Sequence, residues 1–155
     1  MIVDERNMLG SIDMLAQQVR HAWESTAGIT LPAEAKHCRQ VVLFGMGGSA
    51  LGMDVARAVY AGSATVPLLV VNDYVLPGYV STDTLAILSS YSGTTEETVI
   101  AAKLVQARTK LLAVVTTGGP LADLMTQQQI PGYQIEATYN PCGQPRIAVG
   151  YAVTG

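Results

Sequence analysis

Two loops in this sequence carry groups suited to holding an anion. The first, GMGGSALG at residues 45–52, follows a short apolar run and precedes a helical pattern. Its glycines let backbone N–H groups approach a ligand closely, and the helix that follows turns its positive N-terminus toward the same place. Ser49 adds a hydroxyl donor. The loop is either an anion site built around Gly47, Gly48 and Ser49 or a tight turn between a strand and a helix.

The second loop is rich in serine and threonine, with the sequence SSYSGTTEET at residues 89–98. Thr94 and Glu97 have the spacing of a capping box, which predicts that a helix begins here. Three further hydroxyl donors remain beyond this box: Ser90, Ser92 and Thr95. Neutral donors at a helix N-terminus suit a phosphate dianion. Two such loops favour a sugar phosphate, although a turn that merely caps its helix has the same composition.

The first loop also fits a different ligand. Gly45, Gly47 and Ala50 satisfy the spacing of the dinucleotide fingerprint, and Asp73 follows the next apolar run, where a ribose-binding acid is expected. By this interpretation the chain binds a nicotinamide dinucleotide. The second hydroxyl-rich loop has no role in such a fold, which favours the sugar phosphate.

A third candidate lies near the end of the chain, in the sequence NPCGQPR at residues 140–146. Pro145 fixes the backbone where this loop enters a helix. Arg146 is placed there either to neutralise negative charge developing on a sugar oxygen or as a surface arginine at a helix start.

The elements that position these loops alternate between strand and helix. Continuous Val, Leu and Ile runs, rather than alternating ones, are typical of parallel strands that are covered on both faces. The pattern predicts a three-layer αβα sandwich with about five parallel strands, preceded by an N-terminal helix. The expected strands are 41–44, 66–71, 84–89, 111–116 and 133–137, and the expected helices are 4–26, 50–61, 95–108 and 120–128.

Composition excludes several classes of protein. The 155 residues are 49% hydrophobic and 14% charged, enough for one well-packed core. Nine Lys and Arg against twelve Asp and Glu give a net charge of −3, so we expect no nucleic-acid partner. No apolar stretch is long enough for a membrane span, and no signal peptide is visible. Cys38 and Cys142 form no CxxC motif, which indicates a cytoplasmic location.

Together these motifs resemble a known family. GMGGSALG at 45–52, NDYVLP at 72–77, SYSGTTEET at 90–98, TTGGPLADL at 116–124 and GQPRIAVGY at 143–151 occur in the order found in the N-terminal sugar isomerase (SIS) domain of bifunctional phosphoglucose/phosphomannose isomerases. The resemblance covers nearly the whole chain. Thr94 stands where the family commonly has asparagine, and Cys142 where a small residue without sulfur is expected.

The resemblance implies a flavodoxin-like fold that binds glucose, fructose or mannose 6-phosphate. It assigns the phosphate to Ser90, Ser92 and Thr95, and the sugar to Gly47, Gly48 and Ser49. Arg146 would steady an enediolate while a proton moves between C1 and C2. The family reaction uses no metal and no organic cofactor.

The resemblance also implies a domain organisation. Residues 1–36 would be a helical segment packing on an SIS domain at 37–155. The family's second SIS domain, which supplies the general base, is absent from these residues, and the family forms homodimers. His21, His37, Glu96 and Glu97 are poorly placed to replace that base, so we expect this chain alone not to isomerise. A free-standing regulatory phosphosugar-binding module is the alternative.

Overall fold

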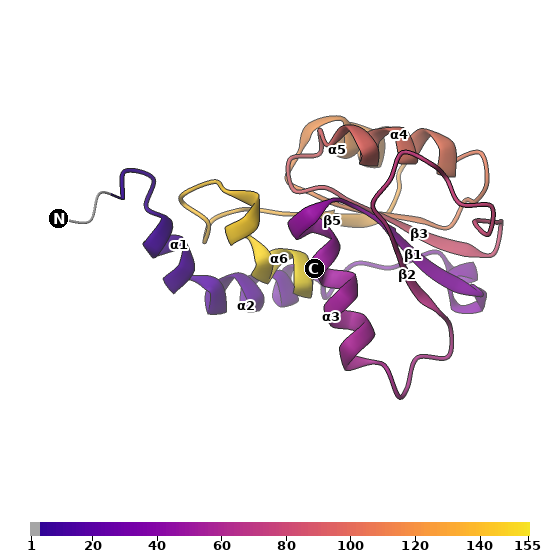
Figure 1. Cartoon of the computed structure of the whole chain (residues 1–155), viewed down its shortest axis with the longest axis horizontal. Helices are drawn as coiled ribbons and strands as arrows, with labels where there is room; N and C mark the ends of the chain where they lie inside the picture. The colour runs from indigo at the N-terminus through magenta and orange to yellow at the C-terminus, as the bar shows by residue number, and fades with distance from the viewer. Residues whose placement is uncertain (1–3) are drawn as a thin grey trace.

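Five parallel strands form one sheet in the computed structural model, which describes residues 4–155 (Figure 1). The strands are β1 (Gln40–Phe44), β2 (Leu68–Val71), β3 (Thr84–Ser89), β4 (Leu112–Thr116) and β5 (Gly132–Gln134). Their spatial order is β2-β1-β3-β4-β5, and every neighbouring pair is parallel. This is the order of flavodoxin-like sheets. The predicted fold class is therefore confirmed.

Helices cover both faces of this sheet (Figure 1). On one face lie α4 (Glu96–Val105) and α5 (Gly119–Gln127), and on the other lie α3 (Leu51–Val59) and α6 (Val149–Thr154). α2 (Leu15–Thr26) packs against α6, and α1 (Met8–Asp13) precedes it, farther from the sheet. Residues 4–155 also include three short 3-10 turns: η1 (Ala33–His37), η2 (Gly47–Ala50) and η3 (Pro145–Ile147).

The core has a layer on each side of the sheet because alternate strand residues point to opposite faces. Val42 and Phe44 of β1 belong to the larger cluster, which also contains side chains of α4 and α5. Leu43, between them in sequence, packs with Ala50 and Met53 on the side of α3. Both faces of the strands are therefore apolar, which explains the unbroken hydrophobic runs.

The N-terminal segment differs from the single helix predicted over residues 4–26. It forms two helices, separated at Met14, whose backbone leaves the helical region with φ −91° and ψ 7°. The buried face of this segment combines Ala22 with polar side chains. Gln18 and Ser11 are fully buried, whereas Trp23 is 71% exposed and Leu9 52% exposed. Hydrogen bonds from this segment to the C-terminal region, described below, account for the buried polar face.

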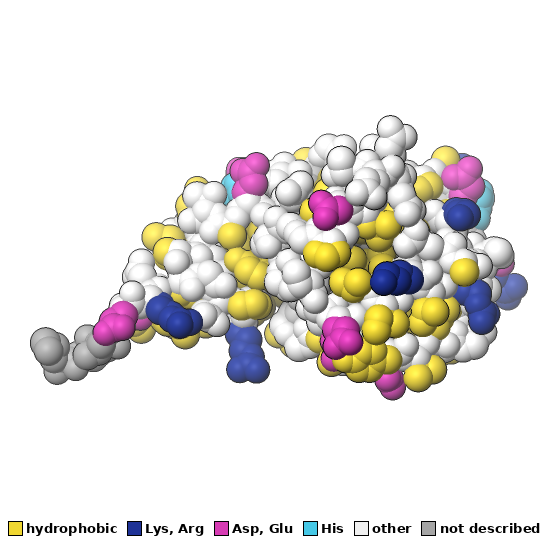
Figure 2. Space-filling model, turned by 90° about the horizontal axis from the view of Figure 1, so that it is seen from above, with side chains coloured by type: hydrophobic (Ala, Val, Ile, Leu, Met, Phe, Trp, Pro, Cys, Tyr) yellow, Lys and Arg dark blue, Asp and Glu magenta, His cyan; other side chains and the backbone are white. Residues whose placement is uncertain are grey.

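The surface carries mixed charge on the face drawn in Figure 2, where basic and acidic side chains are interspersed. Within the described residues, no helix is both long enough and apolar enough to cross a membrane.

Candidate functional site

The candidate site is built at the carboxyl edge of the sheet. β1 lies between β2 and β3, and β3 lies beside β4, so the loops that follow β1, β3 and β4 are neighbours. The two anion-binding loops predicted from sequence are thus brought to adjacent strand ends. At the end of β1, Gly47 has φ +53°, a conformation that glycine adopts without strain, and η2 begins there.

A direct hydrogen bond joins the glycine-rich loop to the serine-rich loop. The Ser49 Oγ accepts from the backbone N–H of Tyr91 at 3.1 Å. The two backbones are also close at the strand ends, since a Cβ added to Gly45 would lie 2.8 Å from the Ser89 carbonyl oxygen. The loops therefore form one continuous surface.

Tyr91 connects two further segments to this surface. Its carbonyl oxygen accepts from the N–H of Thr117 at 2.9 Å and from the Thr117 hydroxyl at 2.6 Å. Its phenol oxygen accepts from the Asn140 side-chain amide at 2.8 Å. Burial raises the pKa of the Tyr91 phenol above its ordinary value, although the Asn140 hydrogen bond opposes this. The phenol is therefore a neutral structural group at physiological pH.

The three predicted phosphate-binding hydroxyls differ in accessibility. Ser90 is fully buried, its Oγ lies 2.7 Å from the Thr95 Oγ1, and it also accepts from the Gly93 N–H. Thr95 is half-buried, and Ser92 is exposed. The Ser92 Oγ lies 2.9 Å from the Thr94 Oγ1 and accepts from the Thr94 N–H at 3.2 Å. Ser92 is therefore the accessible member of the three, and the Thr95 hydroxyl lies next to that of the buried Ser90.

The predicted capping box between Thr94 and Glu97 is wrong. The N-cap of α4 is Thr95, and no side-chain hydrogen bond caps this helix. The Thr94 hydroxyl is instead paired with Ser92, and the turn at Gly93, with φ +70°, delays the start of the helix. The first N–H groups of α4 thus have no side-chain cap, which leaves them suited to an external acceptor.

Arg146 lies beside the glycine-rich loop. It is exposed and belongs to the 3-10 turn η3, so the helix predicted to start here begins later, with α6 at Val149. A Cβ added to Gly48 would lie 3.6 Å from the Pro145 carbonyl oxygen and 3.8 Å from the Arg146 Cα. Tertiary structure therefore joins Arg146 to residues nearly one hundred positions earlier.

The loops are packed tightly where they meet. The cavity between them has a volume of about 10 Å³, enough for about one water molecule. Its lining includes Gly48, Ser49, Tyr91 and Pro145. A hexose phosphate does not fit inside this space, so a ligand at this site would lie over the loops.

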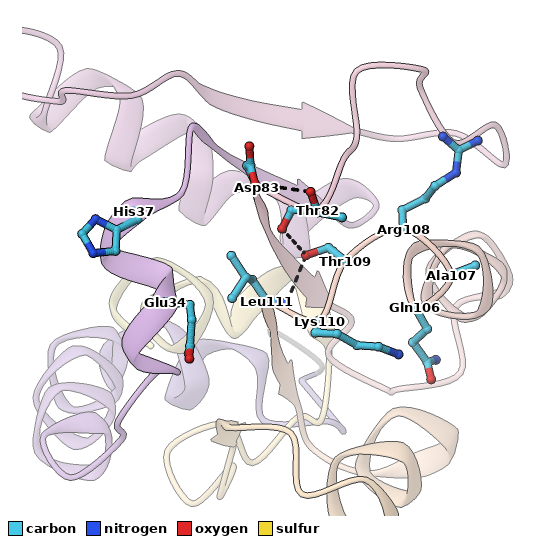
Figure 3. Close-up of a pocket in the computed structure, with 10 residues that line it drawn as sticks. All are labelled: Glu34, His37, Thr82, Asp83, Gln106, Ala107, Arg108, Thr109, Lys110 and Leu111. Atoms are coloured by element: carbon cyan, nitrogen blue, oxygen red, sulfur yellow. Dashed lines mark hydrogen bonds between the residues drawn. The ribbon is translucent and has the colours of Figure 1, made fainter.

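Neither histidine is among the residues that line the cavity between the loops. The His21 ring is packed edge-on against Tyr139 and Tyr151, at centroid distances of 5.5 and 5.9 Å. His37 lines a cavity of about 700 Å³ at the opposite, amino edge of the sheet (Figure 3). The charged side chains around that cavity point in different directions rather than toward one point (Figure 3). Glu96 and Glu97 occupy the first turn of α4.

Asp73 uses its side chain within its own loop. Its Oδ1 accepts from the N–H groups of Tyr74 and Val75 at 2.6 and 3.4 Å. Among residues 4–155, no group of three or more His, Cys, Asp or Glu side chains is arranged to hold a metal ion.

Sequence reasoning missed Tyr91, Thr117 and Asn140 as connecting residues. Tyr91 was visible inside the SYSGTTEET motif, but nothing in a linear pattern indicates that its backbone and phenol join three loops. Thr117 and Asn140 also lie inside motifs named above, but their partners are distant in sequence, so no local pattern marks them as connecting residues.

No protein-family model matches the chain. Comparison with characterised proteins gives a consistent result. The chain is 37% identical over 146 residues to a bifunctional phosphoglucose/phosphomannose isomerase of Caldicellulosiruptor bescii, covering 94% of this chain and 42% of that protein. A protein of the same description from Thermoplasma acidophilum is 35% identical over 112 residues, covering 72% of this chain and 32% of its own length. The chain thus spans less than half the length of these relatives.

Solved structures share the fold at low identity. A candidate phosphosugar isomerase of Salmonella typhimurium matches with a TM-score of 0.54 and 16% identity, over 93% of this chain and 43% of that one. The NanR protein of Vibrio vulnificus, solved with ManNAc-6P, matches with a TM-score of 0.55 and 16% identity, over 90% and 59%. Over 94% of its length, the chain is therefore homologous to the bifunctional phosphoglucose/phosphomannose isomerases.

Proposed function

We propose that this chain binds a hexose 6-phosphate and forms the phosphate-binding part of an aldose–ketose isomerase. The observation that supports this most strongly is the hydrogen bond from Tyr91 N–H to Ser49 Oγ, which unites two donor-rich loops at adjacent strand ends. A phosphorylated sugar needs two sets of donors, one for the phosphate dianion and one for the sugar hydroxyls, and the two loops supply one set each. The homology to sugar-phosphate isomerases favours this ligand over a dinucleotide.

In this proposal the phosphate lies at the N-terminus of α4. The Ser92 and Thr95 hydroxyls donate to it, together with backbone N–H groups of the first turn. Ser90 orients Thr95, since the two hydroxyl oxygens are 2.7 Å apart. A dianion is stabilised here by dipoles and neutral donors, and no lysine is required.

The sugar lies over the glycine-rich loop. Ser49 Oγ accepts from Tyr91 N–H, so its own O–H is available to donate to a sugar oxygen. Gly47 and Gly48 allow the ligand close to the backbone because they have no side chain. Arg146, on the neighbouring turn, supplies a positive charge that stabilises an enediolate oxygen.

The reaction we propose moves a proton between C1 and C2 through a cis-enediol, as suggested by the described activity of the relatives. This step needs a base within reach of C2. Glu96 and Glu97 lie beside the proposed phosphate, where a free carboxylate repels the ligand rather than serving C2. We therefore propose that the chain of 155 residues binds the substrate without isomerising it.

Isothermal titration of the full 155-residue chain with fructose 6-phosphate, inorganic phosphate and NAD tests the proposal. We expect fructose 6-phosphate to bind more tightly than phosphate, and NAD not to bind. Arg146→Ala should weaken fructose 6-phosphate binding at least fivefold. Arg39→Ala, at the opposite edge of the sheet, is the matched control and should change nothing. Tighter binding of NAD than of fructose 6-phosphate would refute the proposal.

A second candidate is a phosphosugar-sensing module without catalysis. It is favoured by the shared fold with NanR, whose structure contains ManNAc-6P. The two candidates predict different turnover when the chain is mixed with the part of a relative that it does not match, for example the unmatched part of the C. bescii protein. Isomerisation that appears on mixing, and is lost with Arg146→Ala, supports the enzyme; binding without turnover supports the sensor.

A further inference from the structure

The segment that carries Arg146 is an irregular loop, residues 139–147, which we call the arginine loop. Two turns hold it internally, through the N–H groups of Gly143 and Ile147, and the Asn140 N–H donates to the Ala137 carbonyl just before the loop. The Asn140 side chain adds a hydrogen bond to the Gln144 carbonyl at 3.1 Å and one to Tyr91. The bonds within the loop shape it, whereas its placement over the sheet depends on contacts with other elements, among them the Asn140 bond to the Tyr91 phenol and the Tyr139 N–H bond to the Tyr151 hydroxyl.

Two residues of the N-terminal helices supply such contacts. The Gln18 side-chain nitrogen donates to the Tyr139 carbonyl at 2.9 Å and to the Ile147 carbonyl at 3.0 Å. Both partners are acceptors, so the nitrogen and not the oxygen must face them. Ser11 Oγ accepts from the Cys142 N–H at 3.0 Å. Gln18 thus joins the two ends of the arginine loop, and Ser11 holds its middle.

These two side chains are placed against the usual preference of helices for burying apolar groups. Gln18 and Ser11 have no exposed surface, while the apolar Trp23 and Leu9 face outward. Close approach supports the arrangement, because a Cβ on Gly150 would lie 2.6 Å from the Gln18 Cβ. Burying an amide is costly unless it is hydrogen-bonded, so the buried Gln18 is explained by its two bonds to the arginine loop rather than by apolar packing alone.

We infer that Gln18, assisted by Ser11, is a positioning residue that holds Arg146 where it meets the sugar. This inference rests on the proposed function and adds a positioning residue for the same site, supplied by the first helices of the chain. Gln18 touches no ligand in it and acts through the backbone of the arginine loop. Removing Gln18 should therefore weaken sugar recognition and leave phosphate recognition intact.

The test compares Gln18→Met, similar in size but without donors, with Gln17→Met, an exposed neighbour on the same helix. We expect Gln18→Met to weaken fructose 6-phosphate binding about tenfold, with inorganic phosphate binding changed less than twofold. In an Arg146→Ala background the Gln18 substitution should have almost no further effect, because Gln18 acts only through the position of Arg146. Gln17→Met should match the unmodified chain.

Two results would overturn the inference. One is unchanged fructose 6-phosphate binding by a folded Gln18→Met chain, and the other is equal weakening of both ligands, which indicates general loss of structure. If Gln18→Met does not fold, Ser11→Ala replaces it, with the same split between the two ligands expected at about threefold.

Hydrogen exchange separates this inference from the proposed function. Gln18→Met should accelerate amide exchange at Gly143 and Ile147, with the Ser90–Thr95 turn unaffected. If the unmodified chain binds neither ligand, the proposed function fails. In that case, unchanged amide exchange at Gly143 and Ile147 in the Gln18→Met chain would refute the positioning role as well. Faster exchange confined to these two amides would show that Gln18 positions the loop even though the proposed function has failed.

Discussion

Ser49 and Tyr91 are 42 residues apart in sequence, yet the backbone N–H of Tyr91 donates to the Ser49 Oγ at 3.1 Å. This bond crosses between the loops that follow β1 and β3, the two strands that lie side by side at the centre of the sheet. It turns two separate motifs into one donor surface. Its loss should therefore affect both stability and binding.

Ser49→Ala removes the acceptor of that bond. We expect unfolding free energy to fall by about 1 kcal/mol, the usual net value of such a hydrogen bond. Fructose 6-phosphate binding should weaken as well, because the same hydroxyl donates to the sugar in our proposal. Urea denaturation and titration calorimetry measure the two effects. Ser63→Ala, at an exposed turn after α3, should leave both unchanged.

Thr95→Val keeps the shape of the side chain and removes its hydroxyl. Since that hydroxyl lies at the start of α4, we expect inorganic phosphate and fructose 6-phosphate to lose affinity together, by about tenfold, or about 1.4 kcal/mol. Calorimetric titration with each ligand measures this. The exposed Thr65→Val is the control. Equal affinity of the Thr95 variant and the unmodified chain would contradict the phosphate assignment.

Gly93→Ala should be the most damaging substitution in the serine-rich loop. Gly93 has φ +70°, and an added Cβ would collide with the Gly118 carbonyl oxygen. We expect a loss of about 3 kcal/mol in unfolding free energy, from strain and forced displacement of backbone. Gly62→Ala provides the comparison, because no atom lies within 4 Å of its added Cβ. Denaturation midpoints that coincide for both variants would refute the close approach.

Stability should fall at high pH because of Tyr133. Burial, with smaller contributions from Tyr151 and Glu136, raises the pKa of Tyr133 from 10.0 to about 12. Between these values the unfolded chain releases the phenol proton and the folded chain retains it. The unfolded state thus binds fewer protons, and unfolding free energy decreases as pH rises from 10 to 12.

Tyr133→Phe tests this dependence. Its unfolding free energy should decline less steeply between pH 10 and 12 than that of the unmodified chain, as measured by urea denaturation at a series of pH values. Tyr60→Phe, at an exposed phenol, should follow the unmodified chain. Parallel curves for the unmodified chain and the Tyr133 variant would show that burial does not hold this phenol neutral.

The strands and their class could be predicted from sequence because burial on both faces leaves a local signature. Thr84–Ser89 was predicted with both ends correct, and β1 and β4 within one residue at their starts. The glycine-rich loop was recognisable for a similar reason. A tight turn between a strand and a helix favours glycine, and this preference is visible in the local sequence. The motifs also pointed to the family that the comparisons confirm.

Helix starts and the inner face of the N-terminal segment were harder to predict. The capping box failed because the Thr94 hydroxyl pairs with Ser92, a competing partner that is closer in sequence than Glu97. The apolar spacing of residues 8–23 does not mark the buried face, because Gln18 and Ser11 are buried by hydrogen bonds to a loop more than 100 residues away.

Sequence by itself determined which segments are strands, which loops carry donors, and where an arginine follows a proline. Only tertiary structure decided that Ser49 accepts a hydrogen bond from Tyr91 and that Arg146 lies beside Gly48. The same is true of the hydrogen bonds from Gln18 to the arginine loop. The physical reason is that residue preferences act over a few neighbouring positions. Hydrogen bonds between loops depend on strand order and helix packing, which bring together parts of the chain that share no local pattern.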